Sequence, residues 1–150
     1  MVDVAASGVE GVPFEIAIER GKLREFARAV QAEHPEYLKG EAPVIPPTFL
    51  TTTFFWEEAV EGSNPWHRVA MSQERGMHAE QEYVFHGPPP RAGTRLKCHS
   101  RIESIYEKEG RRGGKLVFAV MVTEFRDEAG KLVAEARMTG VETEKPPEQA

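Results

Sequence analysis

The sequence predicts an α+β domain in which a curved antiparallel sheet wraps around one long, buried central helix. Three observations predict this fold class. The stretch from residue 42 to residue 60 is apolar on nearly every side, the segment before it has the spacing of an amphipathic helix, and four later segments alternate apolar and polar residues. A helix without a hydrated face has to be surrounded by protein, and a bent sheet can surround it.

Composition and charge exclude several classes of protein. The chain has 150 residues, which suits one domain. Its 19 basic and 24 acidic residues leave a net charge of -5, whereas a nucleic-acid-binding protein needs a basic surface. No apolar run approaches the ~20 residues that cross a membrane, and we expect no signal peptide. Cys98 is the only cysteine, so no internal disulfide can form and we expect a cytoplasmic location.

The first part of the chain predicts one strand and one amphipathic helix. Residues 1–12 are small and weakly patterned, so we expect a flexible N-terminus and a domain that starts at residue 13. Apolar residues that alternate with polar ones predict a short strand: Phe14, Ile16 and Ile18. Apolar residues spaced i, i+3, i+4 and i+7 predict the helix: Leu23, Phe26, Ala27 and Val30. Pro35 ends this helix near Glu33, and a loop follows at residues 37–41.

The central helix is predicted to begin after Pro46 and Pro47, whose fixed φ and missing N–H suit the start of an element. Thr48 can cap the turns that follow. No hydrated face is expected before Glu57. The apolar residues of the helix are Phe49, Leu50, Phe54, Phe55, Trp56, Ala59 and Val60. Threonines and aromatic residues favour a strand by propensity, but the length and the start of the run favour a helix.

Antiparallel strands are predicted after the central helix, at residues 78–85, 95–108, 116–125 and 132–141. Residues 66–76 have no clear pattern. In the longest strand one face is expected to carry Leu96, Cys98, Ile102 and Tyr106. The polar residues 142–150 predict a disordered tail, so the domain is expected to span residues 13–141.

Four segments together point to a known family: the helix at 23–30, the Ala-Pro-Val-Ile-Pro-Pro-Thr-Phe run at 42–49, the segment at 76–86 and the turn at 91–96. On these segments, residues 21–141 resemble the MaoC-like dehydratases and hydratases, which have the hot-dog fold. The chain looks most like their N-terminal type, the non-catalytic subunit of (3R)-hydroxyacyl-thioester dehydratases. The resemblance implies a single hot-dog domain that binds an acyl-CoA or acyl-carrier-protein thioester, with no cofactor.

The catalytic branch of that family carries an Asp-x-Asn-Pro-x-His run after the first helix. Its His takes the proton beside the thioester carbonyl, and its Asp works with the leaving hydroxyl. Here the run is Ala32-Glu-His-Pro-Glu-Tyr37, with Ala32 at the Asp position and Tyr37 at the His position. Alanine cannot transfer a proton, and tyrosine is a poor base near neutral pH. His34 and Tyr37 are weak candidates for a catalytic role, and exposed side chains at a helix end are the preferred interpretation.

Two further patterns imitate functional sites. The run Asn64-Pro-Trp-His67 looks like Asn-Pro-x-His, but Gly62 stands where the Asp is needed, so we favour a helix-ending turn in which Trp66 is packed. His78 and His86 fall on one face of a strand by strict alternation. Only nearby glutamates offer a third metal ligand, so no metal site is predicted.

Substrate binding is assigned to the start of the central helix. The family resemblance implies that backbone N–H groups there polarise the thioester oxygen. The predicted substrate-binding residues are Pro47, Thr48, Phe49 and Leu50, of which the last two are candidates to line an acyl-chain tunnel. Glu57 and Glu58 suggest the carboxylate of a hot-dog thioesterase, but their late position favours a solvated or interface face.

The predicted function is that of a subunit of an (R)-specific enoyl-thioester hydratase or 3-hydroxyacyl-thioester dehydratase in fatty-acyl metabolism. Lacking the dyad, the chain is expected to act as a hydro-lyase only within a complex, supplying the acyl tunnel and a dimer surface. Hot-dog sheets pair edge to edge, which implies a homodimer or a heterodimer with a catalytic MaoC-like subunit. Neither a nucleic acid nor a membrane is expected as a partner. Two alternatives stay open, a hot-dog acyl-CoA thioesterase and a non-enzymatic acyl-CoA-binding homodimer.

Overall fold

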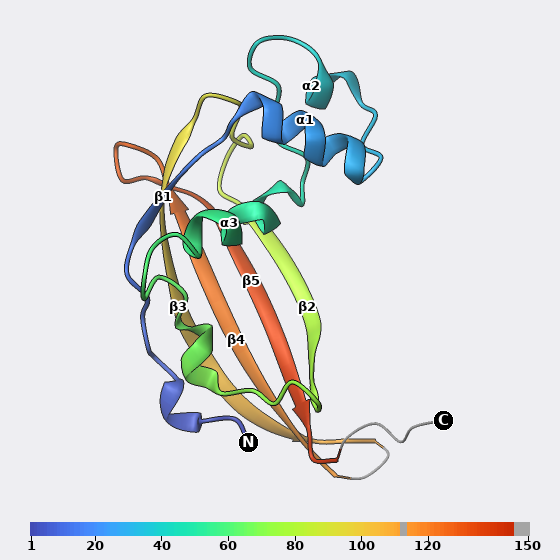
Figure 1. Cartoon of the computed structure of the whole chain (residues 1–150), viewed down its shortest axis with the longest axis vertical. Helices are drawn as coiled ribbons and strands as arrows, with labels where there is room; N and C mark the ends of the chain where they lie inside the picture. The colour runs from blue at the N-terminus through green and yellow to red at the C-terminus, as the bar shows by residue number, and fades with distance from the viewer. Residues whose placement is uncertain (112–113, 146–150) are drawn as a thin grey trace.

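The computed structural model describes residues 1–111 and 114–145, which form a curved five-stranded antiparallel sheet and several short helical segments (Figure 1). The strands lie in the order β1-β3-β4-β5-β2. Their bounds are β1 Phe14–Ala17, β2 Gly76–Phe85, β3 Arg95–Glu109, β4 Lys115–Arg126 and β5 Leu132–Thr143. Figure 1 shows the long strands bending around the helix α3, with α1 and α2 at one end of the sheet. The predicted arrangement of a curved antiparallel sheet around a central helical segment is therefore found.

The first helix is shorter than predicted. α1 spans Arg20–Ala29 and buries Leu23 and Ala27, on the predicted face. Gln31 follows with a φ of 56°, a left-handed conformation that does not continue a helix. Pro35 then starts a separate one-turn helix, α2 Pro35–Leu38, where a loop was expected, because proline suits a first helical turn. In the described part of the chain no helix is long and apolar enough to cross a membrane.

The central element lies at the predicted position but is shorter than the predicted helix. It consists of a 3-10 turn, η2 Phe49–Thr53, followed directly by one α-helical turn, α3 Phe54–Glu57. The hydroxyls of Thr52 and Thr53 donate hydrogen bonds to the carbonyls three residues before them, at 2.9 and 2.6 Å. Such side-chain bonds compete with regular helix geometry, which accounts for the tight turn.

The exposure of the central element also corrects the prediction. Phe54 and Phe55 are 45% and 53% exposed, whereas Glu57 is only 5% exposed. The sheet covers one side of the helical segment, and the two phenyl rings lie against each other on another side, with centroids 4.0 Å apart and planes inclined by 33°. The Lys22 ammonium lies 4.1 Å from the Phe55 ring centroid and covers part of this apolar surface.

A β-bulge follows Ile102 in β3 and changes which side chains face the core. The residues predicted to point inward before the bulge are buried: Leu96, Cys98 and Ile102. After it, Ile105 packs toward the core and Tyr106 stacks on Phe118 of β4, with ring centroids 5.1 Å apart. The expectation that Tyr106 shares the inward face is therefore wrong, because one extra residue reverses the sides of all residues that follow.

The N-terminal residues, which were expected to be flexible, run along β3 and hydrogen-bond to it. They include the 3-10 turn η1 Val4–Ala6. The Gly8 N–H donates to the Ile102 carbonyl and the Ile102 N–H donates to the Val9 carbonyl, both at 2.8 Å. Buried apolar side chains in this segment are Val2 and Ala6. The sequence did not reveal this packing because small residues in an irregular segment have no periodic pattern.

At the other end of the chain, β5 continues to Thr143, beyond the predicted end at Val141. Glu142 is 4% exposed and accepts hydrogen bonds from the Ser72 N–H at 2.8 Å and from the Arg75 guanidinium at 2.6 Å. These bonds hold the end of β5 to the loop before β2. The first two residues of the predicted tail therefore belong to the sheet, while residues 146–150 lie outside the described residues.

The core lies between the inner face of the sheet and the helical segments. The largest fully buried side chains of its main cluster include Leu23, Ile45, Phe49, Leu96 and Phe125. A smaller cluster joins the N-terminal segment to β3, β4 and the 3-10 turn η3 Pro65–Val69. The candidate site lies between the central helical segment and the inner face of the sheet, next to β2.

Candidate functional site

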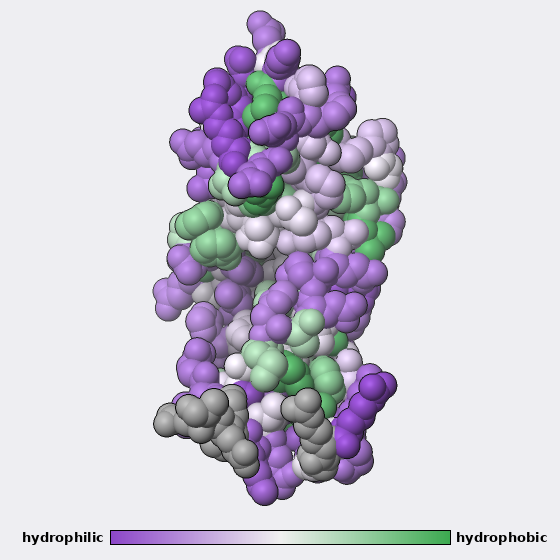
Figure 2. All heavy atoms as spheres, turned by 90° about the vertical axis from the view of Figure 1, so that its right-hand side faces the viewer, coloured by the Kyte–Doolittle hydropathy of each residue, from purple (hydrophilic) through white to green (hydrophobic). Residues whose placement is uncertain are grey.

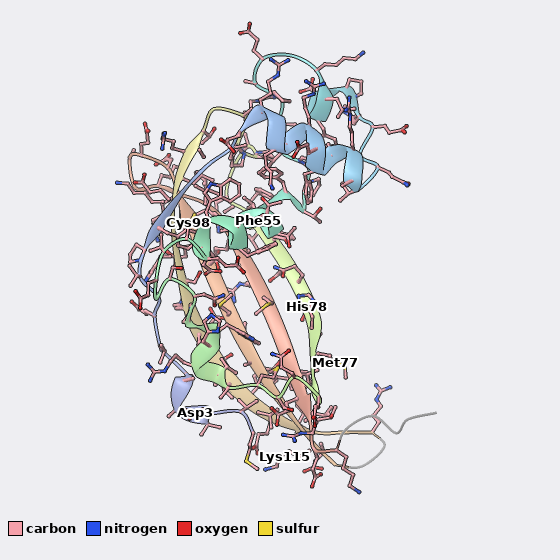
Figure 3. The ribbon with its side chains drawn as sticks, in the orientation of Figure 1. Asp3, Phe55, Met77, His78, Cys98 and Lys115 are labelled. Carbon is pink, nitrogen blue, oxygen red and sulfur yellow. The ribbon has the colours of Figure 1, made fainter. Side chains whose placement is uncertain are left out.

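A groove runs between the central helical segment and the inner face of the sheet, next to β2. It has a volume of about 230 Å3. The apolar side chains that line it come from η2, α3, β4 and β5: Leu50, Phe54, Met121, Phe125, Ala136 and Met138. Figure 3 labels His78 on β2 and Phe55 on α3, the two elements that flank the groove. The groove can therefore hold an apolar chain, and polar side chains provide the other seven of its thirteen lining residues.

His78 reaches the groove because a bulge follows it in β2. The bulge places His78 on the same face as Gln81 and Tyr83, and the His78 Nε2 lies 3.3 Å from the Gln81 Oε1. His86 lies past the end of β2 and pairs with Glu135 at 2.8 Å. The expectation that both histidines share a face is wrong, because the bulge adds one residue between them.

Glu57 provides the carboxyl group of the groove. Its Oε1 accepts a hydrogen bond from the Ser100 hydroxyl at 2.9 Å, and the Ser100 hydroxyl lies 2.9 Å from the Thr123 hydroxyl. No basic side chain of residues 1–111 and 114–145 forms an ion pair with Glu57. The expected solvated or interface face is therefore wrong for Glu57, whereas Glu58 is exposed.

Helical spacing explains why Glu57 is buried. Leu50, Thr53 and Glu57 stand at i, i+3 and i+7, so they share the face that packs on the sheet. This spacing is visible in the sequence and would have identified Glu57 as a groove residue. Burial raises the pKa of Glu57, and the Ser100 hydrogen bond and the charge of His67 lower it only in part. The carboxyl group consequently stays protonated to a higher pH than a free glutamate.

The Glu57→Gln variant is expected to melt a few degrees higher than the wild type near pH 8, and at the same temperature near pH 4. The pKa of Glu57 is higher in the folded than in the unfolded state, so its stabilising contribution is complete below the unfolded pKa and is lost as the pH rises through the folded pKa. Glutamine is neutral throughout. Thermal unfolding followed by circular dichroism checks this, with the exposed Glu58→Gln as control. A variant less stable than the wild type near pH 8 would contradict the raised pKa.

Of the four residues predicted to bind substrate, Leu50 lines the groove. Phe49 is 1% exposed and packs edge-to-face on Phe26, with ring centroids 5.4 Å apart, so it belongs to the core. Pro47 and Thr48 are exposed just before η2 and do not line the groove. The substrate-binding role of these four residues stays a prediction.

His34 and Tyr37 lie at the start of α2, outside the groove. The His34 Nδ1 accepts a hydrogen bond from the Glu36 N–H at 3.3 Å and so caps the helix. The Tyr37 ring lies 5.8 Å from the His34 ring, centroid to centroid. A capping histidine agrees with the interpretation of polar side chains at a helix end.

The run from Asn64 to His67 starts η3 and does not reach the groove. The Asn64 side chain accepts a hydrogen bond from the Trp66 N–H at 2.9 Å and so caps the start of η3, where the sequence favoured a helix-ending turn. The Trp66 ring packs on β5, where a Cβ on Gly140 would lie 2.7 Å from it. Within the described ranges, no group of three His, Cys, Asp or Glu side chains is placed to hold a metal ion.

Known proteins match this chain in sequence over most of its length. A family model described as FAS1-like, dehydratase domain region, matches residues 5–136. A UPF0336 protein of Streptomyces coelicolor is 32% identical over 106 residues, which cover 65% of this chain and 67% of that protein. A UPF0336 protein of Streptomyces griseus is 29% identical over 127 residues, which cover 79% of each.

Solved structures match it over nearly the whole chain. The C-terminally truncated HadBC (3R-hydroxyacyl-ACP dehydratase) complex of Mycobacterium tuberculosis is 25% identical, with a TM-score of 0.68 over 90% of this chain and 96% of that chain. A MaoC-like dehydratase is also 25% identical, with a TM-score of 0.71 over 92% of this chain and 42% of that chain. The ChsH1-ChsH2 complex of Mycobacterium tuberculosis shares the fold, with a TM-score of 0.72 and 13% identity over 97% of this chain and 89% of that chain.

Proposed function

The chain belongs to the FAS1-like dehydratase domain family, and from this membership we propose that it is a subunit of an (R)-specific enoyl-thioester hydratase or 3-hydroxyacyl-thioester dehydratase in fatty-acyl metabolism. Its likeness to MaoC-like dehydratases and its hot-dog fold, both predicted from the sequence, are confirmed by the solved structures that it matches. In this proposal the groove binds the acyl chain of a CoA or carrier-protein thioester, and a catalytic MaoC-like partner supplies the Asp and the His.

The groove beside β2 is the observation that carries the proposal. Most of its lining surface is apolar, which suits an alkyl chain, and the polar side chains, seven of the thirteen lining residues, can orient a thioester. The positions of the family's dyad hold Ala32 and Tyr37, which cannot replace an Asp and a His at neutral pH. A chain with a ligand groove but without this dyad needs a second chain for dehydration.

The free edge of β2 supports a partner next to the groove. β2 ends the strand order, so its outer edge pairs with no other strand of the described chain. A ten-residue edge strand with unpaired N–H and C=O groups is a template for strand pairing, whereas β1 at the other edge has only four residues. Figure 2 views the β2 side and shows a mainly hydrophilic surface with separate hydrophobic areas. Because β2 also contributes His78, Gln81 and Tyr83 to the groove, a strand paired with β2 would lie beside the ligand.

A heterodimer is the form that we propose. The related HadBC structure is named as a complex and as a 3R-hydroxyacyl-ACP dehydratase. A homodimer of this chain would contain no Asp-x-Asn-Pro-x-His run, so a different chain has to contribute it. The thiol of Cys98 is buried and unpaired, which suits the cytoplasmic location that we propose.

Co-expression with a MaoC-like chain of the same genome that carries the intact run tests this function. We expect the two chains to co-purify and to hydrate a trans-2-enoyl-CoA, followed as the loss of absorbance of the conjugated thioester. The chain alone is expected to be inactive. A partner whose run has His replaced by Ala is the control, and it should abolish turnover without preventing assembly. Full hydratase activity of the lone chain would remove the partner role and direct attention to Glu57 and His78.

Acyl-thioester hydrolysis is the second candidate, and the position of Glu57 favours it. A carboxylate on the central helical segment can act as a general base or a nucleophile toward a thioester. Against it, the raised pKa of Glu57 reduces the fraction of carboxylate near neutral pH. Release of free CoA by the lone chain, lost in Glu57→Gln, would establish hydrolysis. Acyl-CoA binding without turnover in any pairing would instead identify a non-enzymatic binding protein.

A further inference from the structure

We infer that Glu57, held by a hydrogen bond from the buried Ser100, forms a polar subsite with Thr123 in the groove, and that this subsite binds a hydroxyl group on the acyl chain at a position beyond the carbon β to the thioester carbonyl. This inference rests on the proposed function, because it takes the groove to be the acyl-binding site. It adds a substrate class, acyl thioesters whose chain carries a second oxygen. In the proposed complex the Asp and the His of the partner act on the hydroxyl at the β carbon, whereas the present chain would bind the second oxygen.

The first step concerns the pairing of Glu57. Its side chain is 5% exposed, yet it forms no ion pair with the described residues, and its only hydrogen bond is the one that its Oε1 accepts from Ser100 at 2.9 Å. In the described structure the second oxygen, Oε2, has no hydrogen-bond partner, although Glu57 lines the groove. Every fully buried side-chain nitrogen or oxygen of the described residues has a hydrogen-bond partner, so Oε2 is accessible from the groove. Because a largely buried carboxyl group costs stability, a purely structural role would be better served by an apolar side chain.

The second step concerns the direction of the hydrogen bonds. Ser100 uses its single O–H to donate to Glu57, so the Thr123 hydroxyl, 2.9 Å away, has to donate to Ser100. Ser100 is 0% and Thr123 8% exposed, so water competes little with this chain of hydroxyls. The Ser100 hydroxyl therefore satisfies Oε1, Thr123 satisfies Ser100, and Oε2 is left as the oxygen that can bind a ligand.

The third step concerns the ligand group that fits Oε2. Burial raises the pKa of Glu57 and the neighbouring Glu58 raises it further, while Ser100 and His67 lower it. In the neutral form Oε2 can donate a hydrogen bond, and in the ionised form it can only accept one. A hydroxyl group both accepts and donates, so it matches either form, whereas a ketone or ether oxygen matches only the neutral acid. An anionic group would be repelled by the ionised form.

Because its surroundings are apolar, the Glu57 carboxyl group can discriminate between hydroxylated and unsubstituted acyl chains. Phe54, Met121 and Phe125 line the groove together with Glu57. A plain alkyl chain in the groove would displace water from Oε2 without replacing its hydrogen bond, and a site built to hydrogen-bond a hydroxyl discriminates strongly against the analogue that lacks it. We expect a preference of about tenfold or more for the hydroxylated chain.

Direct binding measurements test the subsite. The chain is titrated with an unsubstituted medium-chain acyl-CoA and with acyl-CoAs of the same length that carry one hydroxyl at successive carbons beyond the β carbon. We expect the hydroxylated ligand of the matching position to bind about tenfold tighter. Glu57→Gln keeps a donor and an acceptor and should retain most of this preference. Glu57→Leu should abolish the preference while still binding the unsubstituted acyl-CoA.

The controls separate failure of this inference from failure of the proposed function. Glu58→Leu changes the exposed neighbour and should keep the wild-type preference. If the wild type binds all the acyl-CoAs equally well, the subsite is overturned and the acyl groove stands. If it binds none of them, alone or with the catalytic partner, the groove proposal itself fails. The wild-type comparison decides even if Glu57→Leu does not fold.

Discussion

Phe49→Ala should lower the free energy of unfolding by about 3–5 kcal/mol, a large part of the stability of a domain of this size. Phe49 is 1% exposed, and its ring packs edge-to-face on Phe26 at the start of the central element. Removing the ring loses its burial and leaves a cavity between α1 and the sheet, because the surrounding structure collapses only in part. Urea unfolding followed by circular dichroism measures the change.

Phe55→Ala is the matched control for this substitution. Phe55 lies in the same apolar stretch, but it is 53% exposed, so the variant should lose less than about 1 kcal/mol. Equal losses at the two positions would mean that the central element is surrounded on all sides, as the sequence predicted. A large loss for Phe49→Ala alone would instead support a helical segment that the sheet covers on one side.

Ala136→Phe should reduce the hydration of a long-chain enoyl-CoA by the reconstituted complex roughly a hundredfold and leave a four-carbon substrate nearly unaffected. Ala136 lies on β5 in the lining of the groove, between Tyr83 of β2 and Thr123 of β4 in the register of the sheet. A phenyl ring there occupies the space of about four methylene groups, and each buried methylene contributes roughly 0.8 kcal/mol. The ratio of kcat/KM values for long and short substrates measures the effect.

The Ala129→Phe variant introduces the same ring in an exposed turn and should leave both substrates unaffected. Thermal unfolding of Ala136→Phe shows whether a loss of activity comes from misfolding, which would affect both chain lengths alike. An equal decrease for both substrates in a stably folded variant would contradict the assignment of the groove to the acyl chain.

Local periodicity was sufficient to predict the strands. The strand expected at residues 116–125 is found at Lys115–Arg126, and the one expected at residues 95–108 is found at Arg95–Glu109. Alternation of side chains depends only on neighbouring residues, so it can be recognised in the sequence. The β-bulges after Ile102 and after His78 leave no such pattern, and they determine the faces of Tyr106 and His78.

The candidate site was predicted only in part. Of the four residues predicted to bind substrate, Leu50 lines the groove, while Pro47 and Thr48 are exposed and Phe49 is in the core. Glu57 was weighed against its neighbour Glu58 instead of against the helical face that it shares with Leu50. Ser100 and Thr123 gave no signal, because β3 and β4 bring them to Glu57 from distant parts of the chain.

The order of the amino acids is enough to establish the family, the antiparallel architecture and the absence of the Asp and His dyad, because each depends on residue identity or on spacing between near neighbours. Three-dimensional packing was needed to establish which side of the central element is buried and that residues 2–11 pack along β3. It also determined that Glu57 hydrogen-bonds to Ser100, which in turn hydrogen-bonds to Thr123. These features depend on contacts between segments far apart in the chain, and a single bulge or a change from a 3-10 to an α-helical turn alters them without changing the local pattern.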